Sequence, residues 1–267
     1  MKEIIDGKKF TLKNENSEKL SQLTGIDYID DEYILVNKVS KNTIAYIHYH
    51  KTLLEKGWDK LSLVLNPHKS SDVSPFLLAY MGGYLEGRLT AEDIKNFLEN
   101  MEFNLKKQDP QNRIIRAIKT FFRNVDENLY NNISKKLISE EEKKFYYRIY
   151  LFYAQLRGLL EGINISLSRK ITIGELLLIQ ADGEIPELMR YFNYKLNGRV
   201  YKLGDKNYFR NVFNFPSESF LWERIMMHSR CSAMIKILKD ENDKPIDLLS
   251  GHVAWTDYTE TYRTYKQ

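Results

Sequence analysis

The chain has only one cysteine, Cys231, among its 267 residues. A single cysteine cannot form an intrachain disulfide, so cysteine usage indicates neither an oxidising nor a reducing compartment. Long apolar runs are lacking too: no stretch approaches the roughly 18 apolar residues of a membrane-spanning helix, and residues 1–20 lack the apolar core of a secretory signal. The sequence therefore predicts no transmembrane segment and leaves the localisation open.

An excess of one charge is also lacking. The net charge of +4 comes from 40 basic and 36 acidic residues that are spread along the chain, without a basic tract of the kind that follows a phosphate backbone. Nucleic acid is therefore not expected as a partner. The chain has no internal repeat and no Gly/Ser linker, and 43% of its residues are hydrophobic, so it can bury a core in one large domain or two small ones.

The N-terminal part is typical of β-strands. Residues 33–37, 42–50 and 58–66 are rich in β-branched and aromatic residues and predict three strands. His48 and His50 fall on one face of the second strand, at a spacing that two metal ligands can use. No third ligand is evident, so the sequence favours two half-exposed strand residues and predicts neither a metal ion nor a cofactor.

Helical patterns fill the middle of the chain. We expect helices over 75–101, with Thr90 capping a second helix, then over 111–130 and from Ser139 onward, and two helices within 171–192 that a turn at Asp182 and Gly183 separates. The helix from Ser139 is expected to pack into the core through one apolar stripe. That stripe consists of Phe145, Ile149, Phe152, Leu156 and Leu160. Strands, then helices, then a final strand pair indicate the α+β class.

The final strand pair contains the only cysteine. The segments "CSAMIKIL" and "IDLLSGHVAWTDY" alternate like strands, and the polar turn "KDENDKP" separates them. A hairpin whose loop is centred on Glu241 and Asn242 would place Cys231 opposite His252. A slip of one residue would move His252 to the other face, so the register decides whether the two residues can act together.

A cysteine beside an imidazole suits nucleophilic acyl transfer, in which a thiolate attacks a carbonyl carbon. The alternative is a small buried cysteine without a chemical role. Ser232 and His252 are a further possible pair, although the chain lacks the G-x-S-x-G sequence of a nucleophile elbow. Single carboxylates such as Glu86 and Glu161 are more typical of capping or packing than of an acid/base pair.

Five sequence blocks, in order, resemble the phospholipase B-like family. They are "GGYLEGRLTAEDI" at 82–94, "YAQLRGLLEG" at 153–162, "ELLLIQADGEIPEL" at 175–188, "CSAMIKIL" at 231–238 and "GHVAWTDYTETYRTYK" at 251–266. The resemblance implies an N-terminal nucleophile hydrolase with an αββα sandwich, and a lysosomal or secreted glycoprotein. The sequons at Asn132 and Asn164 are the expected glycosylation sites.

The resemblance also implies the site residues. Family members mature by cleavage just before a cysteine, which here places the cut between Arg230 and Cys231. Cys231 would then be the nucleophile, with His252 and Trp255 facing it from the next strand. The family's substrate would be an amide or acyl ester bond, in a lipid for example. The expected division is a pro-segment over 1–230 and the start of the catalytic chain over 231–267.

The chain departs from the family pattern at two points. Val253 and Ala254 stand where the family has asparagine and threonine, and family members continue beyond Gln267 with the residues that complete the oxyanion site. We therefore expect an incomplete sandwich whose partner is the missing C-terminal portion, and a chain that alone stays uncut. The alternative function is a non-catalytic truncated or divergent homologue that binds lipid or a partner chain.

Overall fold

The computed structural model describes residues 12–13, 22–30, 32–66, 68, 73–133, 140–197, 231–254 and 264–266. Two compact units divide the chain: residues 1–185 together with 262–267, and residues 186–261. The predicted division between residues 230 and 231 refers to an expected cleavage and not to a boundary between compact units. That division stays a prediction.

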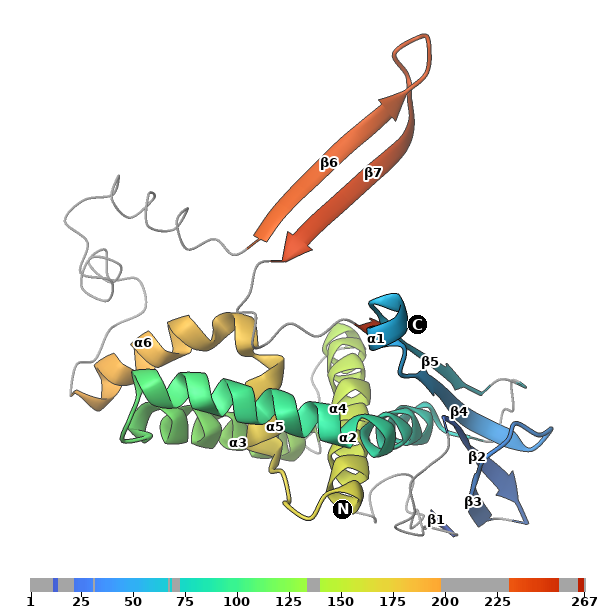
Figure 1. The fold of residues 1–267 in the computed structure, drawn as a ribbon, viewed down its shortest axis with the longest axis horizontal. Coiled ribbons are helices and arrows are strands. Elements are labelled where there is room, and N and C mark those ends of the chain that lie inside the picture. The colour runs from blue at the N-terminus through green and yellow to red at the C-terminus, as the bar shows by residue number, and fades with distance from the viewer. Residues whose placement is uncertain are drawn as a thin grey trace. The chain divides into compact units, whose positions relative to one another are not determined.

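The first unit contains a mixed six-stranded sheet (Figure 1). Its order is β1-β3-β2-β4-β5-β8, antiparallel at the centre, with β1 and β8 added in parallel at the edges. The strands are β1 (Leu12–Lys13), β2 (Leu23–Ile29), β3 (Glu32–Val36), β4 (Thr43–His50), β5 (Asp59–Leu65) and β8 (Thr264–Lys266). The three predicted strands are thus confirmed within one or two residues, whereas the central strand β2 was missed.

The described residues contain six α-helices and one short 3₁₀ segment. They are α1 (Leu53–Lys56), α2 (Pro75–Gln108), α3 (Arg113–Ile133), α4 (Glu140–Ser166), α5 (Ile173–Gln180), η1 (Asp182–Glu184) and α6 (Ile185–Leu196). All of them except α1 fall in the predicted helical regions. The predicted break at Thr90 is wrong. The Thr90 hydroxyl donates to the carbonyl of Glu86, 2.7 Å away and one turn back, so α2 continues through this residue instead of ending there.

One face of the sheet packs on α2. Ile47 of β4 and Leu61 of β5 are almost fully buried in one core cluster with Met81, Tyr84 and Leu85 of α2. Burial of each large apolar side chain contributes roughly 1.5–3 kcal/mol relative to its exposure to water, so this cluster is the main reason that α2 lies on the sheet. The α+β class is confirmed. A second sheet packed on the first, as in an αββα sandwich, stays a prediction.

Helix α4 crosses α2 (Figure 1). Glycines of both helices form a seam at the crossing. Gly83 and Gly87 of α2 meet Gly158 and Gly162 of α4, one turn apart on each helix. A Cβ atom at Gly83 would lie 1.9 Å from the carbonyl oxygen of Gln155, so no larger residue fits. Because glycine lacks a Cβ atom, the two helix backbones approach each other more closely at the seam than residues with a side chain would allow.

The glycine seam also corrects the predicted apolar stripe of α4. Phe145 and Phe152 are 60% and 48% exposed, whereas Leu159 and Ile163, beside the seam, are buried. Leu156 is buried as predicted. The stripe was wrong in its N-terminal half, because helical spacing alone does not show that the glycines decide which face of α4 meets α2.

A capping box begins helix α5. The Thr172 hydroxyl accepts from the backbone N–H of Glu175, and the Glu175 carboxylate accepts from the backbone N–H of Thr172 at 2.8 Å. Glu175 also forms an ion pair with Lys119 of α3 at 3.2 Å. Burial alone would raise the pKa of Glu175, but the Thr172 N–H and the Lys119 charge outweigh it and lower the pKa from 4.5.

Replacement of Glu175 by glutamine is expected to destabilise the protein at neutral pH and less so in acid. Glutamine can keep the capping contacts, so the variant isolates the carboxylate charge. A carboxyl with a lowered folded pKa stabilises the fold above its unfolded pKa near 4.5, and the benefit is lost as the pH falls through the folded pKa. Urea unfolding between pH 3 and pH 7 measures the difference. Glu184→Gln, at an exposed position, is the control.

Within the described ranges, no helix combines the length and the apolar character that a membrane crossing requires.

Candidate functional site

The second unit contains the expected β-hairpin with the cysteine at its start. Strands β6 (Cys231–Lys239) and β7 (Pro245–Ala254) pair in antiparallel orientation. Cys231 is the first residue of β6, and His252 lies in β7. Cys231 and His252 therefore belong to neighbouring strands, as predicted.

The predicted register of the hairpin is wrong by two residues. Cys231 pairs with Ala254, and His252 pairs with Ala233. The turn explains the shift. The Asp240 carboxylate accepts from the backbone N–H groups of Asn242 and Lys244, each at 2.9 Å, and the loop is centred on Asn242, which shifts the pairing by one residue. A β-bulge at Leu238 and Lys239 adds the second residue of the shift.

A register shift of two residues leaves each position on the same face of the hairpin as before. Side chains alternate along a strand, so positions 231 and 233 share one face of β6, and positions 252 and 254 share the corresponding face of β7. Cys231 and His252 thus occupy diagonal positions on one face of the hairpin. Diagonal neighbours in a sheet are about 7–8 Å apart, within reach of long or aromatic side chains.

The same face of the hairpin is apolar and exposed. Ile235 is 71% exposed, and Ile237 and Leu248, which pair with each other, are 54% and 58% exposed. Their alternation places these three side chains on the face that carries positions 231 and 252. The face of the candidate nucleophile can therefore form apolar contacts, and so can the opposite face, where Met234 and Leu249 are 64% and 48% exposed.

The structure describes only some of the other predicted site residues. Arg230 and Trp255 lie outside the described residues, and Asn132 belongs to α3 with a side chain that is not described. Asn164, near the end of α4, uses both amide atoms on the backbone of Ile171: its nitrogen donates at 2.9 Å and its oxygen accepts at 2.7 Å. Glycosylation of Asn164 stays a prediction, and this tie to the backbone weighs against it.

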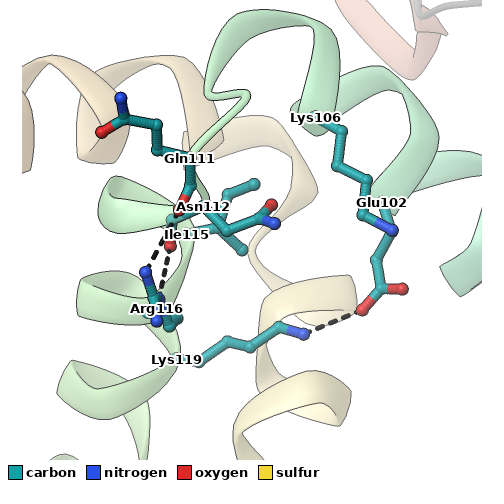
Figure 2. A pocket seen from close by; sticks show the side chains of 7 residues that line it. All are labelled: Glu102, Lys106, Gln111, Asn112, Ile115, Arg116 and Lys119. Carbon is teal, nitrogen blue, oxygen red and sulfur yellow. Dashed lines mark hydrogen bonds and ion pairs between the residues drawn. The ribbon is translucent and has the colours of Figure 1, made fainter.

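A charged cavity lies where α2 and α3 join (Figure 2). Its volume is about 410 Å³, and it is lined by Glu102, Lys106, Gln111, Asn112, Ile115, Arg116 and Lys119. Lys119 pairs with Glu102 at 2.8 Å, and the Arg116 guanidinium donates to the carbonyls of Gln111 and Asn112, each at 3.1 Å. None of the predicted site residues lines the cavity, and its lysine, arginine and glutamate side chains offer charged binding contacts.

A polar network missed by sequence analysis ties β4 to α2. The Tyr49 hydroxyl donates to Asp93 at 3.0 Å, and Lys51 pairs with Asp93 at 2.9 Å. Asp59, which is buried, accepts from the backbone N–H of Leu53 at 2.8 Å. Alternation along β4 shows that Tyr49 faces the core, but the positions of its carboxylate partners require the tertiary fold. The network is structural in every contact that is described.

His48 and His50 lie together on β4, as their spacing predicts. Their side chains are half-exposed, and Nδ1 of His48 is 3.2 Å from Nε2 of His50. Burial lowers the pKa of His48, and the neighbouring His50 adds to the effect. The described residues contain no group of three or more His, Cys, Asp or Glu side chains placed to hold a metal ion.

Comparison with known proteins identifies the family of the chain. The model of the family described as Phospholipase B matches residues 45–267, which include α2, α4 and the whole β6–β7 hairpin. The chain belongs to the phospholipase B family. The resemblance inferred from five sequence blocks is thereby confirmed.

The relatives within the phospholipase B family are distant and longer. Phospholipase B-like protein D of Dictyostelium discoideum is 25% identical over 95% of this chain and 40% of its own length. Phospholipase B of Crotalus adamanteus is 27% identical over 85% of this chain and 37% of its own length, and human Phospholipase B-like 1 is 22% identical over 86% and 36%. The chain thus spans about two-fifths of the length of the curated relatives that it matches.

Proposed function

We propose that this chain carries the nucleophile of a phospholipase B-like hydrolase that acts on an amide or acyl ester bond of a lipid. Cys231 would become an N-terminal nucleophile after cleavage of the Arg230–Cys231 bond, within an αββα sandwich completed by the remaining length that the relatives have. Membership of the family supports the class of activity. The observation that carries the assignment of the residue is the position of Cys231 at the start of β6, with His252 on the same face of β7.

The chemistry begins with ionisation of the thiol. The freed α-amine of Cys231, with an ordinary pKa of about 7.7–8, takes the thiol proton, and the sulfur attacks the carbonyl carbon of the substrate. The leaving amine or alcohol receives the proton as the C–N or C–O bond breaks, which leaves a thioester on Cys231. Water then attacks the thioester carbonyl, releases the fatty acid and restores the thiol.

A positive neighbour is needed where the pH is low. At pH 5, ionisation of a thiol with an ordinary pKa of 8.5 costs about 5 kcal/mol, at 1.36 kcal/mol per pKa unit. A protonated imidazole stabilises a nearby thiolate and reduces this cost. His252, at the diagonal position on the neighbouring strand, is assigned this role.

Product analysis with a protein of the relatives' full length tests the proposed function. The wild type is expected to release fatty acid from a diacylphospholipid or from an N-acylated amine, and His252→Ala is expected to lower kcat at pH 5, because the thiolate loses the positive charge that stabilises it. Ser232→Ala, the neighbouring hydroxyl variant, should retain activity. Alkylation of Cys231 after cleavage tests the thiol separately from maturation.

The alternative function has its own signature. A non-catalytic homologue would bind phospholipid vesicles without releasing fatty acid, and Val253 and Ala254, which stand where polar residues are expected near the nucleophile, favour it. Full activity after alkylation of Cys231 would overturn the nucleophile assignment. Saturable binding to vesicles without release of fatty acid would show that the alternative, non-catalytic function is the correct one.

A further inference from the structure

Two imidazoles converge on one face of the sheet. In β4 the side chains of Ile47 and Tyr49 are buried in the core with α2, whereas those of His48 and His50 alternate to the opposite face and are half-exposed. Water and dissolved ions can therefore reach both rings. The rings are in direct contact, with centroids 3.7 Å apart.

The distance between the two ring nitrogens fits a shared metal ion. Nδ1 of His48 and Nε2 of His50 are 3.2 Å apart. Zinc–imidazole bonds are about 2.0–2.1 Å long, so an ion bound to both nitrogens at this separation would have an N–metal–N angle of about 100°. That angle lies between the 90° of square-planar and the 109° of tetrahedral coordination. The two nitrogens need not move apart to bind one ion.

Among the described residues, the cross-strand neighbours of the two histidines supply no further carboxylate, thiolate or imidazole ligand. Ser62 of β5 and Leu23 of β2 lie opposite His48, and Lys60 of β5 lies opposite His50. None of the three is a competing carboxylate, and a lysine ammonium has no lone pair to donate. Water would therefore complete the coordination, which gives an exchangeable surface site rather than a closed structural one.

The donor set selects the class of ion. Imidazole nitrogen suits zinc, copper and nickel, whereas magnesium and calcium prefer oxygen ligands. Among divalent ions of the first transition row, copper binds such a site most tightly. We propose that His48 and His50 form a two-imidazole binding site for a late transition metal ion, with Cu²⁺ bound more tightly than Ni²⁺ or Zn²⁺.

Calorimetric titration of the untagged 267-residue chain with CuCl₂, NiCl₂ and ZnCl₂ at pH 7.5 tests the site. Because thiolate is also a metal ligand, Cys231→Ala is the background for all variants. One saturable site is expected. His48→Gln and His50→Gln should each weaken it by at least about tenfold, since loss of even an outer-shell partner costs about 10–100-fold in metal affinity.

His68→Gln is the matched control, because His68 is an exposed histidine whose Nε2 contacts only the carbonyl of Ser40 among the contacts described. This variant should bind like the background chain. Electron paramagnetic resonance of the Cu²⁺ complex gives a second readout, with two nitrogen couplings in the background chain and one in each single variant. No saturable binding, or binding unchanged in His48→Gln/His50→Gln with native circular dichroism, would overturn the site.

Discussion

Replacement of Gly158 by alanine is expected to lower the free energy of unfolding by about 3 kcal/mol or more, at the upper end of the usual range for overpacking. The added Cβ atom would lie 1.9 Å from the carbonyl oxygen of Tyr80 and 2.9 Å from the backbone nitrogen of Tyr84, both in α2. A clash with a side chain can be relieved by a rotamer change, but a clash with backbone cannot. The two helices must therefore move apart along the seam.

Chemical unfolding followed by circular dichroism measures this loss. For a domain of 150–250 residues a loss of 3 kcal/mol corresponds to a fall in Tm of roughly 6–12 °C. Gly183→Ala is the matched control: Gly183 has no atom within 4 Å of the added Cβ, so the same substitution should change stability little. A Gly158→Ala protein as stable as the control would show that α2 and α4 do not pack as closely as the seam requires.

Gly83→Ala probes the same seam from the other helix. The added Cβ atom would meet the backbone of Gln155 and Leu159 in α4. The Gly83→Ala variant should therefore lose a similar free energy of unfolding. Once the helices have separated for one substitution, the second meets less resistance. The double variant is therefore expected to lose less than the sum of the single losses, as is usual for residues in contact.

The periodicity of apolar residues predicted most strands and helices correctly, but it did not predict which of them pack together. The strands around 33–37, 42–50 and 58–66 were predicted because alternation of buried and exposed side chains is a local property. Strand β2 was missed because "LTGIDYI" contains a glycine and an aspartate, residues that are depleted in strands. In the fold Asp27 accepts hydrogen bonds from the hydroxyls of Ser40 and Thr43, which satisfy a buried carboxylate.

The contact between the two glycine pairs could not be predicted from the sequence alone. Glycines four residues apart are visible at 83 and 87 and again at 158 and 162. Nothing local indicates that the two pairs face each other, because the contact depends on how two distant helices cross. The apolar stripe of α4 was consequently placed on Phe145 and Phe152, which the structure leaves exposed.

The placement of Cys231 and His252 on neighbouring strands was predictable, whereas their exact pairing was not. Alternation placed Cys231 and His252 on neighbouring strands, but the pairing depended on a turn and a bulge whose hydrogen bonds cannot be counted from composition. The convergence of His48 and His50 was visible as a spacing, while their 3.2 Å separation depends on ring orientations that only the structure provides.

Cleavage before Cys231 is expected to be all or none in a protein of the relatives' length. The thiol sulfur would attack the carbonyl carbon of Arg230, and the peptide nitrogen would leave with the thiol proton, which forms a thioester and the free α-amine of Cys231. Water then hydrolyses the thioester and leaves a carboxylate on Arg230. Donors that hold the developing oxyanion lower the barrier.

Intact mass under denaturing conditions detects the cut. Denaturation is required because β8 pairs with β5, and the Lys266 ammonium lies 2.6 Å from the Glu86 carboxylate, so residues on the two sides of the cut are in contact within the first unit. The relatives are about two and a half times as long as this chain, since the matched region is 40% of the first relative's length. Without the donors expected in that further length, the 267-residue chain should remain one piece of 31.6 kDa.

Substitution at Cys231 separates autocatalysis from cleavage by another protease. Cys231→Ala removes the nucleophile and should leave the longer protein uncut, whereas Ser232→Ala changes the next residue and should be cut normally. If the 267-residue chain is cut, a piece of 37/267 of 31.6 kDa, roughly 4.4 kDa, should appear. Cleavage of Cys231→Ala at the wild-type rate would exclude Cys231 as the autocatalytic group, because an alanine side chain has no atom that can attack the Arg230 carbonyl.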